Sequence, residues 1–243
     1  MVKANNPAGR LYDVLSNAKK HPPTQSEPSR KIWSSVLGAN PDSTLLIKRL
    51  VQLMEELDDT IARLKKQENF TLALHEPQLR AIRHALSPTH LNAHWEHVVQ
   101  QLSDSSMISL ASAADWLAHH DPDGEINANE LSALQREIEE LVEEILGSEL
   151  DATFREFVLD QLEKIRSAIL EYRLRGPAAL REALESTTGA ILLNRSLIEK
   201  EAAKEEGTIL KRFERVVSTT HALVVTIANF HQLAEPLIRL LPM

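Results

Sequence analysis

The chain has 243 residues, of which 43% are hydrophobic and 26% are charged, a balance typical of folded proteins that excludes intrinsic disorder. A net charge of −8 and only 4% aromatic residues argue against nucleic-acid binding, which relies on neutralised phosphates and on stacked bases. The chain contains no cysteine, which excludes disulfides and thiolate chemistry. We therefore expect the partners of this chain to be proteins.

Two further observations bear on its location. The sequence has no run of roughly 20 consecutive apolar residues, the length that a membrane-spanning helix requires, so no membrane span is expected. The first ten residues also lack the apolar stretch of a secretory signal. The expected location is therefore the cytoplasm.

The spacing of apolar residues predicts the fold class. Apolar side chains recur with the 3.6-residue period of a helix, and no stretch alternates long enough to suggest a sheet. The seven glycines lie far apart, mostly at the ends of these periodic segments, where helices stop. The sequence predicts an all-α protein, a multi-helix bundle of about ten helices.

The N-terminal region combines a helix with a proline-rich linker. Residues 8–20 are predicted to be helical, and the prolines and small polar residues of 21–29 cannot continue that helix. Residues 1–31 hold six basic side chains and two acidic ones. We therefore predict a basic N-terminal arm, 1–29, followed by a helical bundle domain, 30–243.

A long helix near residues 42–68 is the next predicted element. Asp42 or Ser43 can cap it, and its apolar residues follow one another at steps of three and four, as in a coiled coil. These residues are Leu46, Leu50, Leu53, Leu57, Ile61 and Leu64. Two shorter helices, near 76–86 and 88–102, each have a proline in the first turn.

Within the helix predicted at 88–102, three histidines form a stripe beside the apolar face. His90, His94 and His97 stand at i, i+4 and i+7, a spacing that allows zinc or a redox metal to bind within a helical bundle. The alternative is that their rings bond to backbone, water or a partner's surface. Because histidine titrates near pH 6.5, that contact would be pH-sensitive.

Residues 119–130 resemble the calcium loop of an EF-hand. The resemblance assigns the four carboxylates of Asp121, Asp123, Glu125 and Glu130 to this loop, with Gly124 at its central turn. The departure is the first loop position, where His119 replaces the aspartate of the family. The resemblance implies a calcium-responsive helical protein. The alternative is a turn between helices, followed by a capping box of Asn127 and Glu130.

Residues 104–150 are strongly acidic, with twelve carboxylates and one basic residue, Arg136. The helix predicted from Asn127 to Leu146 turns its apolar side to the core and leaves Glu137, Glu140 and Glu144 in one exposed row. Such a row is either a solvated face or a docking surface for a basic partner. The chain's own basic arm is one candidate partner, and another subunit, identical or different, is a second.

The C-terminal half reads as further helices. Apolar spacing from Phe154 to Tyr172 predicts a helix that ends at Gly176. Residues 177–241 read as a short helix and two or three longer ones, with breaks near Gly189, Gly207 and Pro236. The apolar residues at the end of the chain are predicted to dock on the core or on another chain; they are Leu237, Ile238, Leu240 and Leu241.

Familiar active-site motifs are absent: the sequence has no glycine-rich phosphate loop, no G-x-S-x-G elbow and no H-E-x-x-H pair. We therefore favour a non-catalytic helical interaction or regulatory module, a subunit of a larger assembly that binds through its acidic helix and its histidine-edged face. The alternatives are a metal-dependent enzyme that uses the histidine stripe and the calcium-responsive protein described above. No organic cofactor is expected, and Zn²⁺ and Ca²⁺ are the candidate metals.

Overall fold

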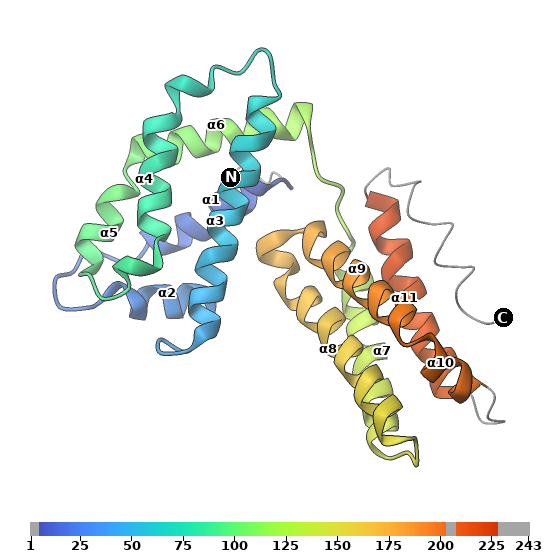
Figure 1. Ribbon diagram of the computed structural model, residues 1–243. Coiled ribbons are helices and arrows are strands. Elements are labelled where there is room, and N and C mark those ends of the chain that lie inside the picture. The colour runs from blue at the N-terminus through green and yellow to red at the C-terminus, as the bar shows by residue number, and fades with distance from the viewer. Residues whose placement is uncertain (1–4, 203–207, 228–243) are drawn as a thin grey trace. The chain divides into compact units, whose positions relative to one another are not determined.

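The computed structural model describes residues 5–202 and 208–227, and this part of the chain is all-α (Figure 1). It holds eleven α-helices and two short 3-10 helices, and within it the only β-type pairing is an isolated bridge between Pro28 and His94. The predicted multi-helix, all-α fold is confirmed. None of the described helices is long and apolar enough to cross a membrane.

The chain divides into two compact units, Met1–Asp123 and Gly124–Met243. This division differs from the boundary predicted after residue 29. Unit 1 contains α1 (Pro7–Lys19), α2 (Ser29–Leu37), α3 (Thr44–Lys65), η1 (Leu72–Leu74), α4 (Glu76–Leu86), η2 (Pro88–His90), α5 (Trp95–Gln101) and α6 (Asp104–His120). Unit 2 contains α7 (Ala128–Leu146), α8 (Ala152–Arg175), α9 (Pro177–Leu193), α10 (Arg195–Ala202) and α11 (Thr208–Ile227).

The N-terminal helix is part of the core of unit 1, not a free arm. α1 packs against α3 and α6, and its residues Leu11, Leu15 and Ala18 are fully buried. Asn6 fixes its start twice, because its side chain accepts a hydrogen bond from the Gly9 N–H at 2.9 Å and donates one to the Ala114 carbonyl of α6 at 2.8 Å. The separate basic arm predicted from composition is therefore corrected.

The long helix predicted near 42–68 is α3. Its cap is Ser43, whose hydroxyl accepts from the Leu46 N–H. Five of the six apolar residues predicted to form its seam are fully buried, while Ile61 is half-buried. Complete burial of a leucine side chain contributes about 2 kcal/mol, so this seam anchors α3 in unit 1.

The helix predicted at 88–102 is broken, and the linker predicted at 21–29 explains why. The N–H of Ser29 donates to the Ala93 carbonyl, and the N–H of Trp95 donates to the Glu27 carbonyl, at 2.8 and 3.1 Å. His94 has extended backbone angles, and the helix α5 begins only after it. Backbone groups that a continuous helix would pair internally are thus used in long-range bonds to the linker.

Unit 2 is built around the apolar faces of α7, α8, α9 and α11. Its buried cluster includes Ile138 and Leu141 of α7, Phe154 and Ile165 of α8, and Phe213 of α11. The predicted helices that end at Gly147 and Gly176 are confirmed as α7 and α8.

Two predicted features at the end of the chain have different outcomes. The break predicted at Gly189 is wrong, because α9 continues through it to Leu193. The predicted breaks at Gly207 and Pro236, and the apolar C-terminal residues, lie outside the described residues.

Candidate functional site

The loop that resembles an EF-hand uses its aspartates in ion pairs. Both carboxylate oxygens of Asp123 are engaged, one by Arg10 of α1 at 2.7 Å and one by Arg63 of α3 at 2.6 Å. Asp121 lies 3.9 Å from the same Arg63 guanidinium. Glu125 and Glu130 belong to unit 2, whereas the two aspartates end unit 1. A calcium ion would have to compete with two arginines for Asp123, so this arrangement adds no support to calcium.

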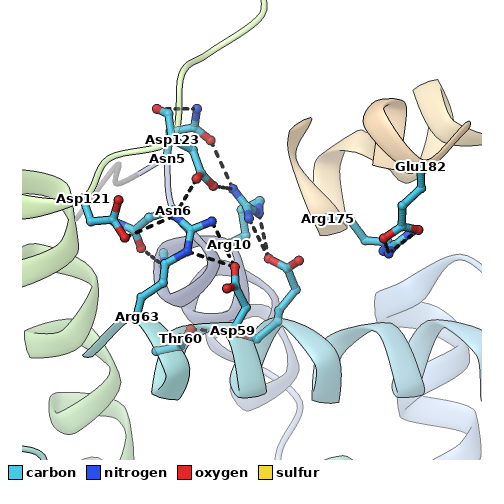
Figure 2. A network of polar contacts seen from close by, with 12 residues as sticks. Asn5, Asn6, Arg10, Asp59, Thr60, Arg63, Asp121, Asp123, Arg175 and Glu182 are labelled. Atoms are coloured by element: carbon cyan, nitrogen blue, oxygen red, sulfur yellow. Dashed lines mark hydrogen bonds and ion pairs between the residues drawn. The ribbon is translucent and has the colours of Figure 1, made fainter. Parts of the chain in front are cut away.

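The residues around Asp123 form one connected cluster in unit 1, and Figure 2 shows side chains of α1, α3 and the segment after α6 converging there. Arg10 also binds Glu56 of α3, with its Nε 2.9 Å and its Nη2 2.8 Å from one carboxylate oxygen. Arg63 binds Asp59, one turn earlier on α3, at 3.0 Å. The arginine side chains retain 9% and 21% of their exposure, so these two guanidinium groups are largely shielded from water.

The backbone adds to this attachment. The Asp123 N–H donates to the Asn5 carbonyl at 3.0 Å, and the Asn5 side chain donates to the Asp123 carbonyl at 3.4 Å. We call residues 121–123, which follow α6 and end unit 1, the connector. It is held to α1 and α3 by main chain and side chains together.

The cluster has more acidic groups than basic ones: two arginines face the carboxylates of Glu56, Asp59, Asp121 and Asp123. Glu56 is the most buried of these four. The pKa of Glu56 is raised to about 7, chiefly by burial and in smaller part by the negative charges of Asp59 and Asp123, against the lowering effect of Arg10. Although burial opposes the charge of Arg63, Asp123 and Asp59 outweigh it and raise the pKa of this guanidinium.

The three histidines of the predicted stripe do not share one helix. His90 lies in η2, His94 precedes α5 and His97 is in its first turn, so the spacing i, i+4, i+7 carries no common helical face. Instead His90 contacts His84 of α4, with ring centroids 4.2 Å apart, and the rings of His94 and His97 are 6.2 Å apart.

Neither zinc nor calcium, the two predicted metals, has a preformed site among the described residues. Among residues 5–202 and 208–227, no three side chains of histidine, aspartate or glutamate lie together in a way that could hold a metal ion. Zinc at the histidines and calcium at the loop therefore stay predictions without geometric support.

The acidic row of α7 is partly neutralised within unit 2. Arg212 of α11 pairs with Glu144 and lies 3.4 Å from Glu140. In the described part of the chain, Glu137 and Glu143 have no ion pair. Glu139 accepts a hydrogen bond from the neutral amide of Gln135 and interacts electrostatically with Arg166 of α8. Within the described residues, Arg212 is therefore the one cation that forms ion pairs with the glutamates of α7.

Three cations of the N-terminal region, the predicted internal partner of that row, already form ion pairs with other carboxylates. Arg10 belongs to the cluster described above, Lys19 pairs with Asp104 at 2.8 Å, and Arg30 pairs with Asp42 at 2.6 Å. These cations of the N-terminal region are thus engaged inside unit 1.

The chain matches no known family model, no curated protein and no solved structure. Its residues alone must therefore carry any functional argument. Sequence reasoning named Asp121 and Asp123 but missed Arg10, Glu56 and Arg63. One signal was available: Glu56 follows Leu53 by three positions on the buried face of α3, where a charge requires a partner.

Proposed function

We propose that this chain is a helical protein-binding module and that the solvent-facing side of α7 binds a partner with a basic surface. The observation that carries the proposal is the surplus of acid on this helix. Six glutamates and one arginine lie between residues 128 and 146. Arg212 of α11 forms ion pairs with two of these glutamates, Glu140 and Glu144. Within the described residues the other four glutamates form no ion pair, although Arg166 of α8 interacts electrostatically with Glu139.

Folding alone gives little reason for this surplus. Like charges three or four residues apart on a helix destabilise it by a few tenths of a kcal/mol per pair. Glu139 and Glu143 are such a pair and both are exposed, whereas the buried face of the same helix is well packed by Leu134, Ile138 and Leu141. Lysine or arginine side chains of a partner would remove this repulsion and steer the encounter of the two proteins.

The test is a binding experiment with matched charge reversals. The full chain is used as bait in cell extract at low and at high salt, beside the double variants Glu139→Lys/Glu143→Lys and Glu156→Lys/Glu185→Lys. Glu156 and Glu185 are exposed glutamates of α8 and α9, so the second variant changes the net charge equally.

The proposal expects a protein that binds at low salt, is released at high salt, is lost by the α7 variant and is kept by the control variant. It fails if no protein binds, or if both variants retain the same protein equally. Circular dichroism of both variants establishes that they are folded before they are compared.

A further inference from the structure

The cluster that holds the connector consists of groups whose charges do not balance. Two guanidinium groups, both permanently charged, face four carboxylates at short range. When all four carboxylates are ionised, the cluster carries two negative charges in excess. At a carboxylate that is buried within the cluster, such an excess favours the uptake of a proton.

Glu56 is the member of the cluster that can best accept this proton. Its side chain is 7% exposed, compared with 12% for Asp123 and 45% each for Asp59 and Asp121. Asp123 is less suitable, because each of its oxygens already accepts a bond from a different arginine. Among the residues that the structure describes, Glu56 has one cationic partner, Arg10.

We propose that this cluster is a proton-responsive latch, in which protonation of Glu56 fastens the connector to α1 and α3 and loss of that proton loosens it. Arg10 links the protonation of Glu56 to the position of the connector, because it binds both Glu56 and Asp123. When Glu56 is ionised, Arg10 divides its bonds between Glu56 and Asp123; when Glu56 is neutral, Asp123 is the sole anion bound to Arg10. Proton uptake therefore strengthens the hold of Arg10 on the connector and lowers the repulsion between Asp123 and its acidic neighbours.

The segment that yields is the connector, since the other members of the cluster lie on helices. Glu56, Asp59 and Arg63 are on α3, and Arg10 is on α1, two helices that are packed against each other. Asp123 lies three positions after the last residue of α6, in a segment of the chain that is not helical. Repulsion within the cluster is therefore relieved at the lowest cost by movement of the connector.

The charged groups that act on Glu56 are Arg10, Asp59 and Asp123. α1 contributes Arg10, α3 contributes Asp59 and Arg63, and the connector contributes Asp121 and Asp123. Arg83 of α4 pairs with Asp58, on a different side of α3. His119 and His120, at the end of α6, bond to backbone carbonyls of their own helix through Nδ1.

Hydrogen exchange of the Asp123 amide measures the latch directly, because this N–H bonds to the Asn5 carbonyl when the connector is fastened. We would record its protection factor by NMR on the full chain from about pH 5.5 to about pH 8, after correction for the intrinsic rate. A protection factor that falls tenfold or more over this range, and levels off above about pH 7, supports the latch; the fall cannot exceed about tenfold per pH unit for one proton.

Three comparisons identify the group responsible. Glu56→Gln keeps the side chain neutral at every pH, so it is expected to give high, constant protection. Asp123→Asn removes the anion that both arginines bind, so it is expected to give low, constant protection. The Ile126 N–H, which donates to the Tyr172 hydroxyl at 2.9 Å in unit 2, is the internal control and should not respond to pH.

The latch is overturned if the wild-type protection factor is independent of pH, or if Glu56→Gln retains the wild-type profile, since a histidine would then be the cause. If the glutamine variant does not fold, carbon-13 NMR of the wild-type Glu56 carboxyl group decides. A titration of this group near its ordinary value of 4.5, in place of about 7, also refutes the proposal.

Discussion

Glu56 occupies a position on α3 that a leucine would fill in an ordinary amphipathic helix. It lies between Leu53 and Leu57, both fully buried, and one turn before Thr60, whose hydroxyl donates to the Glu56 carbonyl at 2.8 Å. A buried carboxylate is destabilising unless it is paired, and a single arginine shared with another carboxylate compensates for only part of that cost. The ability of Glu56 to take up a proton therefore explains its buried position better than a contribution to packing does.

The stability of unit 1 should consequently depend on pH through Glu56. Its pKa is about 7 in the folded chain and near 4.5 in the unfolded chain, so between these values the folded state binds a proton that the unfolded state has released. The free energy of unfolding therefore decreases as the pH rises through this window and levels off above about pH 7. Between about pH 5.5 and about pH 7 the expected loss is about 2 kcal/mol.

Urea unfolding followed by tryptophan fluorescence is the measurement, because Trp33, Trp95 and Trp116, the three tryptophans of the chain, all belong to unit 1. In the variant Glu56→Gln the same transition should be nearly independent of pH in this range. A wild-type chain whose urea midpoint does not change between the two pH values would contradict the prediction.

At the scale of single elements, the sequence predicted what depends on local spacing and missed what depends on distant partners. The leucine seam and the cap at Ser43 predicted α3, and the glycines at 147 and 176 predicted where α7 and α8 end. The break before Trp95 could not be predicted in this way. It depends on hydrogen bonds to residues of the linker more than sixty positions earlier, such as the bond from Trp95 to Glu27.

The same reasoning separates the candidate site residues. Asp121 and Asp123 stood out by local composition, but the EF-hand resemblance could not indicate that arginines of two helices would bind them. Of the three glutamates predicted as one exposed row, Glu140 is exposed, whereas Glu137 and Glu144 are partly buried. The pairing of Glu140 and Glu144 with Arg212 of α11 is a tertiary contact. Charge on a helix face is readable from sequence, but its neutralisation is not.

Gly176, the residue between α8 and α9, gives a prediction at the scale of single elements. Gly176 has φ of 57° and ψ of −147°, a region that residues with a Cβ atom rarely enter. The variant Gly176→Ala should therefore lower the free energy of unfolding of unit 2 by about 1–3 kcal/mol. Helicity measured by circular dichroism during thermal unfolding reports this loss.

Gly147→Ala is the matched control for that variant. Gly147 also ends a helix, but its φ is −87°, and a Cβ atom there would have its nearest neighbour at 3.7 Å, an ordinary contact distance. Alanine at 147 should leave the transition unchanged or raise it slightly, because alanine restricts the unfolded chain more than glycine does. Equal losses at 147 and 176 would show that the positive φ is not the cause.

At the scale of the whole molecule, each unit has an apolar core drawn from its own helices. The buried cluster of unit 2 runs from Ile126 to Val224 within the described residues. In unit 1, Trp33 and Trp95 pack edge to face with centroids 5.5 Å apart, and the leucines of α3 complete the core. A unit of this size with a core of its own is within the range of domains that fold independently.

Residues 1–123, produced alone, are therefore expected to fold. The fragment includes the whole cluster of Arg10, Glu56 and Asp123, because the connector is part of unit 1. Its tryptophan emission should match that of the full chain, and its urea transition should remain cooperative with a midpoint close to that of the full chain.

A fragment that ends at residue 117 is the control, since it keeps the buried part of α6 through Leu117 but lacks Asp121 and Asp123. Removal of those aspartates leaves Arg10 and Arg63 without their shared anion, so the shorter fragment should unfold at a lower urea concentration. Equal midpoints for the two fragments would mean that the connector adds nothing to unit 1, and an unfolded longer fragment would mean that unit 1 requires the rest of the chain.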